Sequence, residues 1–68
     1  MTEFARRLRT LRERKQISRR TLSELVGLSK NMIALYEQGE VDPPASTVIQ
    51  LAEYFGVSTD YLLGKKNF

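Results

Sequence analysis

Apolar residues recur along the chain at the spacing of α-helices. Phe4, Leu8 and Leu11 lie on one stripe of a helix over residues 2–14, with arginines between them. Shorter segments with helical features follow at residues 19–26, 30–38, 45–55 and 59–63. No run of four or more residues alternates apolar and polar side chains with β-branched enrichment, so no strand is expected. The sequence therefore predicts one all-α domain of five short helices.

The ends of the predicted helices carry capping residues. A serine at an N-cap accepts a backbone N–H of the first turn, and serines precede three of the helices: Ser18, Ser29 and Ser58. Glycine adopts the left-handed backbone that ends a helix, and glycines follow three of them: Gly27, Gly39 and Gly56. Pro44 suits the opening of the fourth helix. Residues 64–68, GKKNF, are predicted to be a flexible tail.

The apolar stripes also identify the side chains that the helices bury together. The predicted core comprises Phe4, Leu8, Leu11, Ile17, Leu22, Leu25, Val26, Ile33, Val48, Ile49, Ala52, Phe55 and Val57. Three large apolar residues in the last helix exceed what one small core needs: Tyr61, Leu62 and Leu63. Part of that helix is expected either to make a dimer contact or to pack in the core.

The link between the second and third helices is too short for a roomy antiparallel hairpin. It consists of residues 27–29, GLS, a length that suits a helix-turn-helix, in which the two helices cross steeply. Ser23, four residues before the glycine of the link, is small enough to let the helices approach, and Ile33 anchors the second of them to the core. The spacing therefore predicts a helix-turn-helix whose second helix, residues 30–38, projects from the domain.

Composition argues against several classes of function. The 68 residues contain no cysteine and no histidine, so thiolate chemistry and the commonest metal ligand are absent. The acidic cluster of Glu37, Glu40 and Asp42 has no nucleophile or phosphate loop nearby. We therefore expect no enzyme, no cofactor, no metal site and no small-molecule ligand. No apolar run approaches the roughly 20 residues that cross a bilayer, and the N-terminus lacks a signal-peptide core, so we expect a cytoplasmic protein without membrane contact.

Basic side chains are concentrated at the start of the chain. Residues 1–20 carry eight of the eleven Lys and Arg side chains against two carboxylates, whereas the rest of the chain carries three lysines against six carboxylates. Such a block is either a solvated helix face or the electrostatic footprint of a polyanionic partner.

Three segments carry a family resemblance: LRERKQISRRTLSELVGLSKNMIALYEQG, the proline of DPP, and TVIQLAEYFGVSTDYLLG. Over essentially residues 4–64 the chain resembles the Cro/C1-type (XRE-like) helix-turn-helix family of phage repressors and bacterial regulators. The resemblance implies a compact lambda-repressor-like DNA-binding domain. It also implies a sequence-specific transcriptional regulator, expected to be a repressor, which binds double-stranded DNA as a homodimer on a pseudo-palindromic operator.

A second hypothesis is a protein-interaction adaptor or antitoxin-like domain that has kept the fold with weak or no DNA binding. The loop GEVD after the third helix favours it, because this loop is often basic in the family and carboxylates repel phosphate. The basic block, together with Lys30 and Asn31, favours DNA.

The resemblance also assigns roles within the third helix. The family's base-contacting positions fall on Lys30, Asn31 and Leu35, with Ala34 beside them. A lysine donates to guanine O6 and N7, and an asparagine pairs with adenine N6 and N7. The other interpretation of Lys30 and Asn31 is that they are ordinary solvated residues. Leu35 either touches a thymine methyl or packs against the first helix.

Further residues are expected to bind phosphate or to brace the helices. Phosphate contacts are expected at the starts of the second and third helices, from Ser18, Arg19, Arg20 and Ser29. Arg19 stands where the family commonly has a glutamine that touches the DNA backbone and braces the recognition helix, and an arginine keeps the phosphate reach. The family pattern also pairs the positions of Arg12 and Glu37, which implies an ion pair between the first and third helices.

Overall fold

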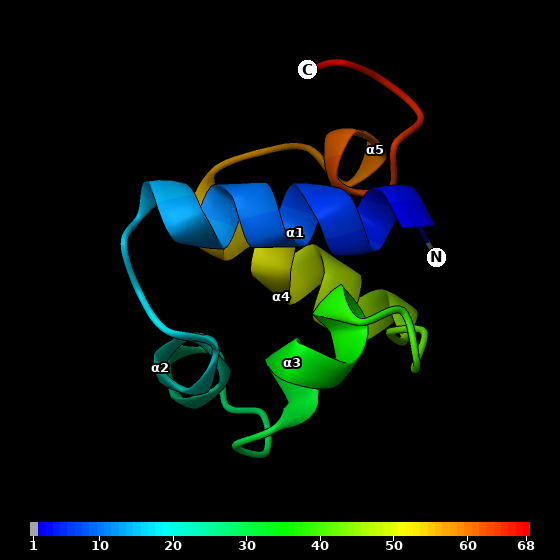
Figure 1. Cartoon of the computed structure of the whole chain (residues 1–68). Helices are drawn as coiled ribbons and strands as arrows, with labels where there is room; N and C mark the ends of the chain where they lie inside the picture. The colour runs from blue at the N-terminus through cyan, green and yellow to red at the C-terminus, as the bar shows by residue number, and fades with distance from the viewer. Residues whose placement is uncertain (1) are drawn as a thin grey trace.

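Five α-helices and no strand form the part of the chain that the structure, a computed structural model, describes, residues 2–68 (Figure 1). The helices are α1 (Thr2–Arg14), α2 (Arg19–Leu25), α3 (Met32–Glu37), α4 (Ala45–Phe55) and α5 (Thr59–Leu62). In Figure 1, α1 crosses the front of the molecule, α4 lies behind it, α2 and α3 lie below, and α5 lies above. The predicted all-α class is confirmed. Among the described residues, no helix has the length and apolar character needed to span a membrane.

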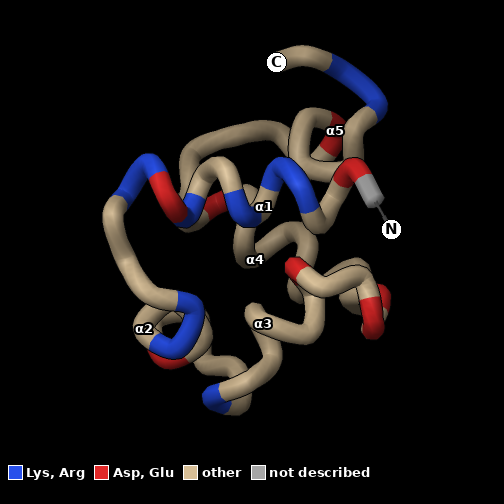
Figure 2. Tube along the Cα trace, viewed as in Figure 1, with Lys and Arg blue, Asp and Glu red and all other residues tan. Residues whose placement is uncertain are grey.

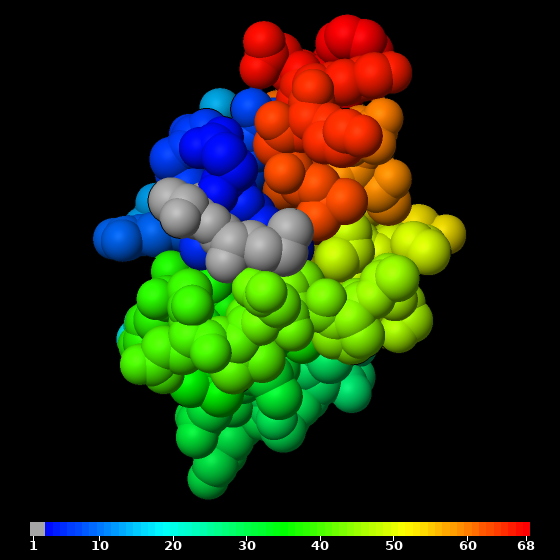
Figure 3. Space-filling model, turned by 90° about the vertical axis from the view of Figure 1, so that its right-hand side faces the viewer, coloured from blue at the N-terminus to red at the C-terminus, as the bar shows by residue number. Residues whose placement is uncertain are grey.

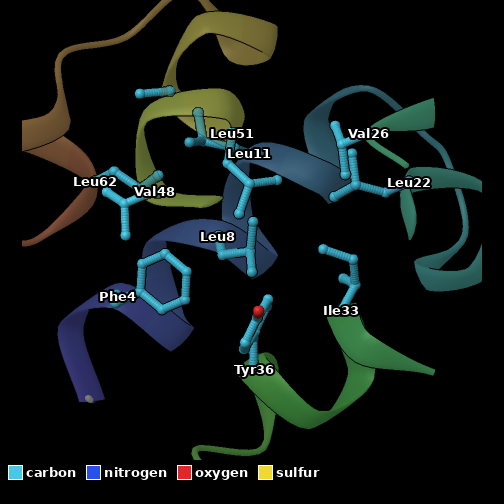
Figure 4. Close-up of a cluster of buried hydrophobic side chains, with 11 residues drawn as sticks. Phe4, Leu8, Leu11, Leu22, Val26, Ile33, Tyr36, Val48, Leu51 and Leu62 are labelled. Carbon is cyan, nitrogen blue, oxygen red and sulfur yellow. The ribbon is translucent and has the colours of Figure 1, made fainter. Parts of the chain in front are cut away.

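The core lies where α1 meets the other helices (Figure 4). Phe4 and Leu8 of α1 are fully buried, and the ring of Phe4 meets Tyr36 of α3 edge to face, with 5.9 Å between the ring centroids. The rest of the cluster comprises Leu11, Leu22, Val26, Ile33, Val48, Leu51, Ala52 and Leu62. The apolar stripe of α1 therefore supports the short helices on both sides of it.

Two residues predicted in the core are exposed instead. Leu25 is 56% exposed and Ile49 is 51% exposed. Each belongs to a helix whose buried face is set by its neighbours: Leu22, Ser23 and Val26 in α2, and Thr47, Val48, Leu51 and Ala52 in α4. At 100° of rotation per residue, Leu25 and Ile49 lie more than about 100° from the centre of those faces. The prediction was wrong because an apolar residue next to a buried one in a helix points to a different side.

The three apolar residues of the last helix divide between core and surface. Leu62 is fully buried in the central cluster, so it packs in the core and is not accessible as a dimer contact. Tyr61 and Leu63 are half-buried and pack against the outside of the cluster. Only these two neighbours keep part of their surface available to another molecule.

Residues 64–68, predicted to be a flexible tail, return to the helices. The guanidinium of Arg7 donates to the carbonyl oxygens of Tyr61 at 2.8 Å and of Lys66 at 2.6 Å, and it lies 4.5 Å from the centroid of the Tyr61 ring. The hydroxyl of Ser58 donates to the carbonyl of Phe68 at 2.7 Å. Figure 3 shows these last residues, in red, above α5 and beside the start of α1. Arg7 therefore connects α1, α5 and the last residues of the chain.

A buried ion pair connects α1 to α3. Arg12 Nε donates to Glu37 Oε2 at 2.6 Å and Nη2 donates to Oε1 at 3.1 Å, so the pair is bidentate. The side chains are 13% and 5% exposed. Arg12 Nη1 also donates to the carbonyl of Ile17 at 2.8 Å. The hydrogen bonds to Glu37 raise the pKa of Arg12 above its ordinary value. The pair that the family resemblance implied is present.

Removing one half of this pair is expected to destabilise the domain. Arg12→Met leaves the Glu37 carboxylate buried without its partner, so we expect the free energy of unfolding to fall by about 3 kcal/mol. Urea denaturation followed by far-UV circular dichroism measures the change. The control is Arg9→Met, which removes an exposed pair with Glu13 and should lower the free energy of unfolding by less than about 1 kcal/mol. Equal losses in the two variants would contradict a structural role for the buried pair.

Candidate nucleic-acid interface

The start of α2 is fixed by Ser18 and presents two basic side chains. Ser18 Oγ accepts the backbone N–H of Thr21 at 3.0 Å, which confirms the predicted N-cap. Arg19 and Arg20 follow in the first turn, and both are exposed. Arg20 lies 3.8 Å from Glu24 in an exposed contact, whereas no ion pair in the described part of the chain involves Arg19. Both guanidinium groups are therefore accessible to an anionic partner.

The turn after α2 is closed by two backbone hydrogen bonds. Gly27 N–H donates to the carbonyl of Glu24 at 3.2 Å, and Leu28 N–H donates to the carbonyl of Ser23 at 2.8 Å, the pattern of a Schellman motif. Gly27 has a φ of 73°, and an added β-carbon would meet no atom within 4 Å, so the left-handed backbone alone favours glycine here. This turn fixes where the chain leaves α2.

The third helix begins at Met32, later than predicted from Ser29. Asn31 occupies its N-cap position without a side-chain capping bond, and Ser29 contributes its carbonyl, which accepts the N–H of Met32 at 3.0 Å. The prediction of a Ser29 side-chain cap was wrong because the hydroxyl that reaches α3 comes from α2. Ser23 Oγ accepts the N–H of Ile33 at 3.2 Å. Residues 29–31 therefore form an exposed turn in front of the helix.

The residues expected to read bases lie in this turn and in the helix that follows. Lys30 and Asn31 are exposed, and within residues 2–68 neither side chain has a hydrogen bond or an ion pair. Ala34 and Leu35 are half-buried. Lys30 and Asn31 lie in the turn before α3, and the backbone N–H of Leu35 donates to the carbonyl of Asn31 at 3.2 Å. The four residues therefore lie in the first turns of α3 and in the segment that leads into it.

The acidic loop after α3 lies away from the basic residues of α2 and of the turn before α3 (Figure 2), although α2 also carries Glu24, which lies 3.8 Å from Arg20. Figure 2 shows basic residues on α2 and in the turn between α2 and α3, whereas the loop between α3 and α4 carries acidic residues on the far side of α3. We use the name α2–α3 face for the exposed residues Ser18, Arg19, Arg20, Ser29, Lys30 and Asn31. The loop GEVD extends from the other end of α3, so its carboxylates follow the helix and do not interrupt this face.

Sequence reasoning missed two polar contacts that position this face. The Gln50 side-chain amide donates to the carbonyl of Val26 at 2.7 Å, which fastens the end of α2 to α4. A glutamine placed between two apolar residues of α4 was the only signal for it in the sequence. Ser23 was singled out for its small size, whereas its hydroxyl also bonds to α3. Ser23 and Ile33 are 10 residues apart and Val26 and Gln50 are 24 residues apart, so no local sequence pattern predicts either contact.

Comparisons with known proteins agree with this geometry. The model of a helix-turn-helix domain family matches residues 5–67. The HTH-type transcriptional regulator ImmR of Bacillus subtilis (strain 168) is 33% identical over 62 residues, which cover 91% of this chain and 49% of ImmR. The cryptic phage CTXphi transcriptional repressor RstR of Vibrio cholerae is 32% identical over 54 residues, which cover 79% of this chain and 49% of RstR. The chain thus spans about half the length of these curated relatives.

A solved structure shares the fold over almost the whole chain. It is the crystal structure of the P22 c2 repressor protein in complex with synthetic operator 9T in the presence of Tl⁺. The TM-score is 0.86 at 27% sequence identity, and the match covers 97% of this chain and 100% of that one. Together with the family match over residues 5–67, this places the chain in the helix-turn-helix domain family, in its Cro/C1 (XRE-like) branch.

Proposed function

We propose that this chain is the DNA-binding domain of a transcriptional regulator and that it inserts α3 into the major groove of an operator. The observation that carries the proposal is the pair Lys30 and Asn31, exposed, without partners among the described residues, and placed beside the basic start of α2. Side chains with this chemistry distinguish base edges in the major groove. The likeness to a repressor solved in complex with an operator supports the same conclusion.

Base reading and phosphate binding are assigned to different residues of the α2–α3 face and of α3 beside it. Lys30 donates to guanine, Asn31 pairs with adenine, and Ala34 and Leu35 offer apolar contact to thymine methyl groups. Phosphate contacts come from Ser18, Arg19, Arg20 and Ser29, and they fix the orientation of the domain on the duplex without reading sequence. The activity that we propose is binding, and the cytoplasm is its proposed location.

Repression follows from occupancy, because a protein seated in the groove of a promoter excludes polymerase from the same DNA. A pseudo-palindromic operator presents two half-sites about one helical turn, or ~34 Å, apart, and a homodimer matches that symmetry.

We infer that the dimer forms through the outside of α4 and α5. An apolar groove of about 350 Å³ lies there, lined by Pro43, Ala45, Val48, Ile49, Thr59 and Leu63. Figure 3 shows α5 directly above the segment that leads into α4.

The base-reading residues are tested by selecting bound sequences from a random duplex pool. We expect an enriched inverted repeat, and we expect Lys30→Ala and Asn31→Ala each to weaken binding to it by ~1–3 kcal/mol and to relax the preference at one base position. Lys65→Ala, which removes a charge from the other end of the molecule, is the control. Binding without any enriched motif would reduce the function to backbone binding, and no binding at low salt would support the adaptor.

The phosphate contacts are tested by the dependence of affinity on salt. Each phosphate contact contributes about −0.9 to the slope of log K against log salt concentration. We therefore expect Arg19→Ala and Arg20→Ala each to make that slope shallower by about 0.9, and to weaken binding to the operator and to random DNA by the same factor. Fluorescence anisotropy at several salt concentrations measures both. A slope that stays unchanged in both variants would remove α2 from the proposed interface.

The dimer is tested by an acidic substitution at the exposed side chain of its groove. We expect Ile49→Glu to leave the domain folded and to lower its affinity for the inverted repeat by at least about tenfold, because the second copy no longer adds its contacts. Binding to a single half-site should not change. Phe68→Glu, at an exposed apolar residue of the chain's last segment, is the control. Cooperative binding that survives Ile49→Glu would place the dimer contact elsewhere.

A further inference from the structure

The third helix begins without a side-chain cap from its own segment. Four backbone N–H groups at the start of any α-helix lack a partner within the helix, and a local Ser, Thr, Asp or Asn usually accepts one of them. In this chain, Asn31 stands at the N-cap and its side chain makes no such bond. Ser29 offers only its carbonyl, to Met32. The side chain of Asn31 is therefore left available for another partner.

Ser23 supplies the missing acceptor from the preceding helix. Its side chain is fully buried, and its Oγ accepts the N–H of Ile33 at 3.2 Å. Ile33 is the second residue of α3, a position whose N–H an N-cap side chain ordinarily accepts. The carbonyl of Ser23 also accepts the N–H of Leu28 at 2.8 Å. One residue of α2 thus holds the chain on both sides of residues 29–31.

Small size alone does not require a serine at this position. Alanine is equally compatible with the close approach of the two helices, and it is the better helix former in the interior of α2. The hydroxyl is the only feature that alanine lacks, and the structure uses it for the bond to Ile33. Without that bond the buried N–H of Ile33 has lost its acceptor, which favours movement of the turn in front of it.

We infer that Ser23 is a positioning residue for base reading: its hydroxyl caps α3 from across the turn and thereby sets where Lys30 and Asn31 lie. The inference rests on the proposed function. The inference distinguishes two kinds of contact, because the two arginines at the start of α2 lie in a turn whose backbone is capped by Ser18 and not by this bond. Loss of the hydroxyl should therefore impair base reading while sparing the phosphate contacts of those arginines.

The test compares Ser23→Ala with the unaltered chain in two measurements. Without DNA, amide hydrogen exchange followed by NMR should show the Ile33 N–H exchanging about tenfold faster in the variant. With DNA, affinity for the selected operator should fall about tenfold, while affinity for a random duplex stays within about twofold. Ser23→Cys keeps the size of the side chain and a weak acceptor, and it should fall between the two in both measurements.

The control is Thr47→Ala, which shortens a mostly buried side chain in α4, away from the α2–α3 face. It should lower stability without changing the ratio of operator affinity to random-duplex affinity. An equal loss of both affinities in Ser23→Ala, or an unchanged exchange rate at Ile33, would overturn the inference. If the unaltered chain selects no operator, the proposed function fails, whereas the exchange measurement still decides whether Ser23 caps α3.

Discussion

Burial of Ile33 and Tyr36 against α1 allows α3 to exist. A helix of six residues is far below the length that is stable alone in water, so its shape must come from tertiary contacts. Tyr36 of α3 packs edge to face on Phe4 of α1, and Glu37 of α3 is bound by Arg12 of α1. These contacts hold the second half of α3. The start of α3, which follows the turn that carries Lys30 and Asn31, is held by the bond from Ser23 to Ile33.

The domain separates its buried charges from its available ones. Arg7 and Arg12 of α1 lie within hydrogen-bond networks, in which their guanidinium groups donate to carbonyl and carboxylate oxygens of the same chain. The basic residues at the start of the sequence therefore do not form one continuous surface, and their net charge is larger than the charge that a partner can contact. Arg19 and Lys30 are the basic residues of the α2–α3 face that have no ion pair in the described part of the chain. The proposed interface relies on where these few charges lie.

The sequence was informative where a pattern is long or local. The stripe of α1 and the caps at Ser18 and Ser58 were predictable because spacing and capping act over a few residues. Leu25 and Ile49 were misplaced because periodicity does not decide which of several clustered apolar residues a helix buries. The start of α3 was misplaced because its capping hydroxyl comes from another helix. The ion pair of Arg12 with Glu37 joins residues far apart in the chain, and only a family resemblance pointed to it. The roles of Lys30 and Asn31 on DNA stay predictions, since they concern a second molecule.

The contacts of Arg7 connect α1 to the last residues of the chain. This one side chain grips the carbonyls of Tyr61 and Lys66, and five residues further along the same helix Arg12 grips Glu37. The last residues of the chain and the C-terminal end of α3 are therefore both bound to α1, each by a guanidinium group. Although the two segments are distant in the sequence, the same helix determines the position of both.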